Sequence, residues 1–291
     1  RHALTYYFVN KFTSPTDRAA VMQAMQLVSY EPPATQSKRR NLSNNKPTPE
    51  VLSKQAGKLM HDMQDIWGRE FDIPMPPEEL FTDMARAKEL GWAYGTPVYV
   101  PEMTLTEEAE YPWWKVRPES WFWEKIKSGE LPEDAAKLPG AWILFDATPK
   151  PDYEDGDQMY RDVFIAGIMK ELRKKKNVES YKIANSRFHA SAEEIERWIL
   201  PAITAKLGSS ASANDQLPTY ILFNVLGNVT FPFLGETDIW EWFADTFSDG
   251  YRAIGGDSRN GGLAYVHWYH PDRRYDNVGF RPLRVYPRNA P

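Results

Sequence analysis

Apolar residues recur every three or four positions in several stretches of the chain, which predicts amphipathic helices. Two of these helices are predicted over residues 49–67 and 77–90, and Gly91 supplies the stop signal of the second one. Ser191-Ala192-Glu193-Glu194 has the form of a capping box and predicts another helix start. The remaining helices are predicted over residues 119–127, 157–176 and 191–207, the last with a kink at Pro201.

Runs rich in β-branched and aromatic residues predict strands between these helices. Such runs cover residues 96–100, 141–147 and 220–226. After Glu241 the pattern changes to short strands separated by loops rich in Gly, Asp, Asn and Arg. Helices and strands are interspersed without βαβ regularity, so the predicted fold class is α+β. Near the start, a strand is predicted over residues 5–9, a helix over 16–27 and a polar loop over 31–49.

Composition narrows the classes of function. Aromatic residues make up 14% of the chain, with 11 Trp and 15 Tyr, which suits a rigid core and also a surface that contacts a partner. The formal net charge of −5 gives no general electrostatic basis for binding nucleic acid or a membrane surface. No apolar run reaches the roughly 18–20 residues of a membrane-spanning helix. We therefore expect no nucleic-acid partner and no membrane insertion.

The C-terminal part of the chain carries a series of spaced anchors. They are Trp240-Glu241-Trp242, Gly255-Gly256, Pro271-Asp272 with Arg274, and the run Asn277-Val278-Gly279-Phe280-Arg281. Trp240 and Trp242 are two residues apart, so on a strand they face the same side. Arg281 offers five donors in a plane and suits the tying together of loop carbonyls or a carboxylate. We expect Arg281 to be buried with at least two such hydrogen bonds.

In their order and spacing, these anchors resemble the C-terminal part of the C-type-lectin fold found in formylglycine-generating enzymes and their relatives. The resemblance covers about the last 50 residues. It implies a C-type-lectin-type unit over residues 1–291, with helical insertions at about 49–91 and 157–207. The same fold also carries the variable proteins of diversity-generating retroelements. There, a reverse transcriptase miscopies adenines, so that Asn codons become codons for many residues, but never for Lys, Glu, Gln, Met or Trp.

The usage of Lys, Glu, Gln and Met in this chain tests that rule. Residues 1–241 contain 17 Lys, 22 Glu, 7 Gln and 9 Met, a frequency that would place about eleven such residues in the last 50. The last 50 residues contain none of them, and use seven Arg and five Asp as their charged residues. A scaffold that favours Arg and Asp would produce part of this bias. The pattern favours a variable ligand-binding region at about residues 252–281.

Within this region we distinguish scaffold positions from display positions. The expected scaffold positions are Gly255, Gly256, Trp268, Pro271, Asp272, Asn277, Gly279, Phe280 and Arg281. The candidate ligand-binding residues, which mutated Asn codons could encode and which we expect on the exposed face, are Gly261, Gly262, Leu263, Tyr265, His267, Tyr269, His270, Arg274, Tyr275 and Asp276.

We expect six of these candidates to converge on one exposed patch: Tyr265, His267, Tyr269, His270, Arg274 and Tyr275. Residues two apart on a strand share a face, and the Pro271-Asp272 turn would bring the later residues back beside them. Tyr, His and Arg also give a recognition surface a large contact area and hydrogen-bonding tips. The alternative is that the first three are one face of an ordinary strand.

The residues support an enzymatic function less well than they support ligand binding. Formylglycine-generating chemistry depends on active-site cysteines, and the chain has no cysteine. His267 and His270 form the only close His pair, and a pair makes a metal site only with a third ligand. Gly256-Asp257-Ser258 resembles the nucleophile block of GDSL-type hydrolases, but no Asp-x-x-His element follows it.

The sequence therefore predicts a ligand-binding protein without catalytic residues, cofactor or transition metal. The expected partner is a macromolecule, either a protein or a surface glycan, met on a virion or cell surface. The alternatives are a lectin-like domain that is not diversified and, with less support, a hydrolase that uses Ser258.

Overall fold

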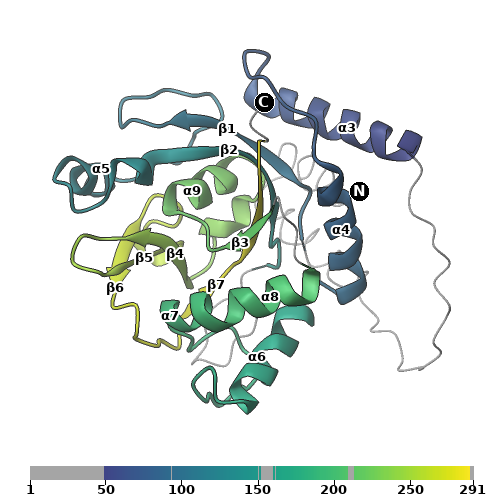
Figure 1. The fold of residues 1–291 in the computed structure, drawn as a ribbon. Coiled ribbons are helices and arrows are strands. Elements are labelled where there is room, and N and C mark those ends of the chain that lie inside the picture. Colours follow the sequence, from purple (N-terminus) through teal and green to yellow (C-terminus); the bar gives the residue numbers. More distant parts are fainter. Residues whose placement is uncertain are drawn as a thin grey trace, which may run out of the picture. The chain divides into compact units, whose positions relative to one another are not determined.

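The computed structural model describes residues 49–92, 94–149, 151, 160, 162–208 and 213–288 (Figure 1). Residues Leu52–Pro291 form one compact unit. The strand predicted over residues 5–9, the helix over 16–27 and nearly all of the loop over 31–49 lie outside the described residues. None of the described helices is long and apolar enough to cross a membrane.

The helices occur close to the predicted bounds, except that the helix predicted from residue 157 begins only at Phe164. Helix α3 spans Pro49–Trp67 and α4 spans Glu78–Leu90, followed by Gly91 in the left-handed conformation at φ 73°. Ser191 and Glu194 form the capping box. The other helices of this group are α5 (Ser120–Lys127), α6 (Phe164–Lys174), α7 (Ala192–Glu194) and α8 (Leu200–Leu207), with a π turn over Ile195–Ile199 between the last two.

The strands form two sheets in which antiparallel pairs predominate, so the class is α+β as predicted. The first sheet has the order β1-β2-β8-β3 and the second has the order β6-β5-β4-β7, where only β4 and β7 run parallel. The first sheet consists of β1 (Val98–Thr104), β2 (Lys137–Phe145), β8 (Leu283–Pro287) and β3 (Asn214–Gln216). The second consists of β6 (Val266–Tyr269), β5 (Arg252–Gly255), β4 (Trp240–Thr246) and β7 (Val278–Phe280).

The predicted strand over residues 220–226 is wrong, because Tyr220–Val229 form helix α9. Every residue from Tyr220 to Gly227 is buried, so the helix has no polar face and its sequence lacks a helical period. The Thr219 side chain caps the helix by accepting a hydrogen bond from the backbone N–H of Leu222. Helix α9 contacts β2 of the first sheet and β4 and β5 of the second (Figure 1).

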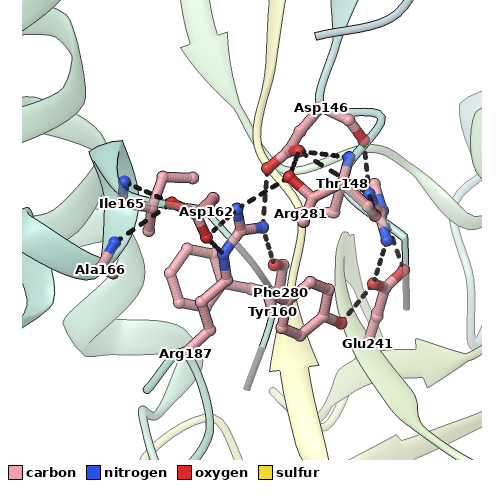
Figure 2. A network of polar contacts seen from close by, with 10 residues as sticks. All are labelled: Asp146, Thr148, Tyr160, Asp162, Ile165, Ala166, Arg187, Glu241, Phe280 and Arg281. Atoms are coloured by element: carbon pink, nitrogen blue, oxygen red, sulfur yellow. Dashed lines mark hydrogen bonds and ion pairs between the residues drawn. The ribbon is translucent and has the colours of Figure 1, made fainter. Parts of the chain in front are cut away.

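A buried network of charged groups joins the two sheets at the point where the chain passes from β7 to β8 (Figure 2). Arg281, fully buried there, donates to the backbone carbonyls of Asp146 and Thr148, just after β2. It also forms an ion pair at 3.1 Å with Glu241 on β4. The expectation that Arg281 is buried and makes several such bonds is confirmed.

Arg187 extends the network. Its guanidinium lies 2.7 Å from a carboxylate oxygen of Asp146 and 2.7 Å from one of Asp162. Burial alone would raise the pKa of Asp146, but the nearby Arg187 and Arg281 outweigh burial and lower it. The third carboxylate of the network needs a further partner, because two arginines face three carboxylates. Asp162 has one, since it accepts the backbone N–H groups of Ile165 and Ala166 at the start of α6.

Tyr160 completes the network and explains Gly279. Its hydroxyl donates to Glu241, and its ring lies where a β-carbon on Gly279 would be, with a ring atom 2.8 Å away. Gly279 is therefore required because the tyrosine comes close, and its backbone does not adopt a positive φ.

We predict that Arg281→Ala lowers the free energy of unfolding by about 3–5 kcal/mol, because it removes the buried cation that pairs with Glu241 and donates to two buried carbonyls. Arg288→Ala is the matched control. Its side chain is 55% exposed and paired with exposed Asp72, so its removal costs less than about 1 kcal/mol. Urea denaturation measures both variants, and equal effects of the two substitutions would contradict the role of the network.

Candidate ligand-binding site

Four rings lie in a row on one face of the second sheet, and we call them the aromatic row: Tyr265, His267, Tyr269 and Tyr275. The first three alternate along β6 and its preceding residue, so strand geometry places them on one face. The loop after β6 returns Tyr275, whose ring stacks on Tyr269 with 4.2 Å between the ring centroids. The centroid of His267 lies 6.2 Å from that of Tyr265 and 5.8 Å from that of Tyr269.

The aromatic row rests on two tryptophans of β4. Trp240 contacts Tyr265 and His267, with centroids 5.7 and 6.5 Å apart. Trp242 contacts Tyr269 and Tyr275 in the same way, at 6.4 and 6.3 Å. The strand register explains this support, because Trp242 pairs with Ile254 and Ile254 pairs with His267 across the sheet. The two tryptophans share a face, as the sequence predicts.

The floor under the aromatic row is rigid, whereas the row itself reaches solvent. Trp242 is fully buried, and its indole N–H donates to the backbone carbonyl of Ala190 at 3.0 Å. All four side chains of the row are half-buried. Each ring therefore offers one side to the tryptophans and another to a partner.

Partial burial favours the uncharged forms of His267, Tyr269 and Tyr275. Burial lowers the pKa of His267 below its ordinary value of 6.5, which favours the neutral imidazole. Burial also raises the pKa of Tyr269 and Tyr275 above 10. The row therefore offers ring faces, hydroxyls and imidazole nitrogens to a partner, and contacts of that kind depend little on salt.

His270 and Arg274 have contacts outside the aromatic row, although the sequence groups them with it. The His270 ring packs on Tyr251, with centroids 4.2 Å apart, and Tyr251 also contacts Trp268. The Trp268 ring in turn lies 5.1 Å from the ring of His267, measured between centroids, so Tyr251 and Trp268 connect His270 with the aromatic row. Arg274 instead forms two hydrogen bonds, at 3.0 and 2.9 Å, with the carboxylate of Glu194.

Asp276 and Gly261 are exposed, as expected. Asp276 lies 2.8 Å from Nδ1 of His189, whose ring stacks on Tyr181. Nothing in the sequence indicates the contact between Asp276 and His189, because 87 positions separate them.

The expectation that Gly262 and Leu263 lie on the exposed face is wrong, because both are buried. Gly262 has φ 60°, and a β-carbon there would lie 2.6 Å from the carbonyl oxygen of Gly235, so no larger residue fits. The Leu263 side chain fills the space that side chains at Gly227 and Gly235 would need. Its apolar side chain thus belongs to the core beneath α9.

The enzymatic alternatives gain no support from these positions. His267 and His270 face different ring neighbours, and in the described ranges no group of three His, Cys, Asp or Glu could hold a metal ion. Ser258 is exposed at the start of a short 3-10 helix (Ser258–Asn260), and no described histidine bonds to it.

No protein-family model matches the sequence, and no curated protein and no solved structure matches it either. The function therefore has to be inferred from the site itself.

Buried positions and half-exposed positions of the candidate site should respond differently to substitution. Leu263→Ser should lower the free energy of unfolding by about 2–5 kcal/mol, as expected for loss of a buried leucine. Tyr269→Ser should lower it by less than about 1.5 kcal/mol, because the ring is half-exposed and leaves no cavity. Chemical denaturation of both variants gives the comparison. A larger loss for Tyr269→Ser would mean that the aromatic row is part of the core.

Proposed function

We propose that this protein binds a macromolecular ligand through the aromatic row, displayed on a C-type-lectin-type scaffold as in the variable proteins of diversity-generating retroelements. The partner is a protein or a glycan on a cell or virion surface. The observation that carries the proposal is the row itself, four contiguous half-exposed rings on a buried tryptophan floor.

The chemistry of the row suits recognition. Tyrosine and histidine have few rotatable bonds, so ordering them on binding costs little conformational entropy. Their rings supply contact area, and their hydroxyls and nitrogens supply hydrogen bonds. This combination is typical of surfaces that bind macromolecules.

A diversified surface also requires that its side chains can change without loss of the fold. The groups that hold the second sheet in place lie elsewhere. Arg281 and Glu241 connect the sheets, and Trp240 and Trp242 form the floor. All four row residues could derive from mutated Asn codons, whereas Glu241 and the two tryptophans could not. Three of the four supporting residues therefore differ in type from the residues that mutated Asn codons can encode, and Arg281 is the exception.

The alternative of a lectin-like domain that is not diversified has one observation in its favour. Arg274 and Asp276, both expected to vary, make specific contacts with Glu194 and His189 outside the variable region. Contacts of this kind fit side chains that are fixed. We therefore restrict the proposed display surface to the aromatic row.

Two libraries test the proposal. One randomises Tyr265, His267, Tyr269 and Tyr275, and the matched control randomises Trp240, Trp242, Leu263 and Val266, which are buried. Most members of the first library should fold, because its positions are half-exposed, and most of the second should not. Selection against a panel of unrelated purified proteins should then yield binders from the first library.

Folding is scored by resistance to protease on the displaying phage, before any selection for binding. Equal losses of folded protein in the two libraries would remove the basis for a variable row. A first library that folds but yields no binder to any member of the panel would count against ligand recognition.

A further inference from the structure

A polar groove with a volume of about 620 Å³ lies beside the second sheet. It is bounded by the end of α6, by the turn between α7 and α8, and by the loop after β6. The side chains that matter for its chemistry are Lys176, Asn177, Glu193, Arg197, Trp198 and Asp272. Its volume falls within the range of about 300–1,000 Å³ that is usual for ligand sites.

Hydrogen bonds from two arginines hold the backbone around the groove in place. Arg173 is buried and donates to the carbonyls of Glu179, Ile183, Ala184, Ser186 and Phe188, which fixes the loop after α6. Burial lowers the pKa of Arg173 to about 10, so it stays charged at neutral pH. On the other side, Arg274 and Glu194 form two hydrogen bonds. Internal hydrogen bonds thus hold the backbone of the groove in shape, so it needs little ordering to bind a ligand.

One wall of the groove is a π turn, a feature that is rare and often found at functional sites. It spans Ile195–Ile199 and directly precedes Pro201, whose missing N–H cannot continue the regular helical bonding. Arg197 and Trp198 project from this turn into the groove lining, with the guanidinium 5.1 Å from the ring centroid. This wall therefore lies just before Pro201, the position at which the sequence predicts a kink.

Five side chains in the groove make no hydrogen bond to any residue in the described part of the chain. They are Lys176, Asn177, Glu193, Arg197 and Asp272. Together they offer ammonium, guanidinium and amide donors as well as carboxylate and amide acceptors. The groove lining contains four basic residues and four acidic ones, so its formal charge is zero.

From these observations we infer that the groove binds a neutral saccharide. Hydroxyl groups both donate and accept, so they can use this mixture of donors and acceptors fully. A polyanion would meet the carboxylates of Glu193 and Asp272, and a cation would meet Lys176 and Arg197. Trp198 adds an apolar surface for the C–H face of a sugar ring. This site is separate from the aromatic row and does not depend on what the row binds.

The experiment uses the full chain on an array of neutral, sialylated and sulfated oligosaccharides, alongside an array of peptides. Arg197→Ala/Glu193→Ala removes one donor and one acceptor and keeps the net charge. Lys175→Ala/Glu124→Ala is the matched control, because both residues are exposed and lie outside the groove. All four substituted residues are exposed, so we expect both variants to fold, which circular dichroism checks.

The wild type and the control should bind neutral oligosaccharides, and the groove variant should lose at least tenfold in affinity. A third variant with serine at all four positions of the aromatic row should keep this saccharide binding, which separates the groove from the row. Absence of neutral saccharide binding, a preference for sulfated glycans or peptides, or full binding by the groove variant would each overturn the inference. Loss of binding in the row variant alone would assign the saccharide to the row instead.

Discussion

The position of the aromatic row depends on one buried guanidinium. Arg281 lies where the chain crosses from the second sheet to the first, and it bonds to backbone carbonyls after β2 and to a carboxylate on β4. A buried cation of this kind is tolerated only when all its partners are in place. Because those partners belong to both sheets, the requirement fixes one sheet relative to the other. The sheet that carries the row is thus fixed by contacts on the face opposite to the row.

Strand alternation then separates support from display. On β4, Glu241 points to the buried network, while Trp240 and Trp242 point to the opposite face and carry the rings of the row. On β6, Val266 is buried, whereas His267 and Tyr269 stay half-exposed. The residues of the row and the buried residues that stabilise the sheet therefore occupy different positions of the same short strands. Substitution in the row can leave the support unchanged.

Local signals made part of the fold predictable from the sequence. Gly91 and the capping box at Ser191 and Glu194 marked helix ends correctly, because caps act over a few residues. Helix α9 was mistaken for a strand because burial on all sides removes its period. Thr219, its N-cap, was the one local sign of a helix.

The candidate site was predictable only where strand alternation determines it. The two-residue spacing placed Tyr265, His267 and Tyr269 on one face, and the turn at Pro271-Asp272 brought back Tyr275. Leu263 and Gly262 were misplaced because their burial depends on α9 and Gly235, which are distant in sequence. The groove could not be found at all, since residues 173–198 and 272–274 meet only after folding.

The central claim is that the aromatic row is a surface whose residues are replaced in nature while its support is kept. The most direct measurement is to sequence the gene and its flanking DNA in many independent isolates of the source. The account predicts replacements concentrated at the codons of Tyr265, His267, Tyr269 and Tyr275, all reachable by adenine mutation of Asn codons. It also predicts a nearby reverse transcriptase gene and a near-identical repeat of the 3′ coding segment. Invariant codons in the row, or replacements spread equally over Trp240, Trp242 and Arg281, would contradict it.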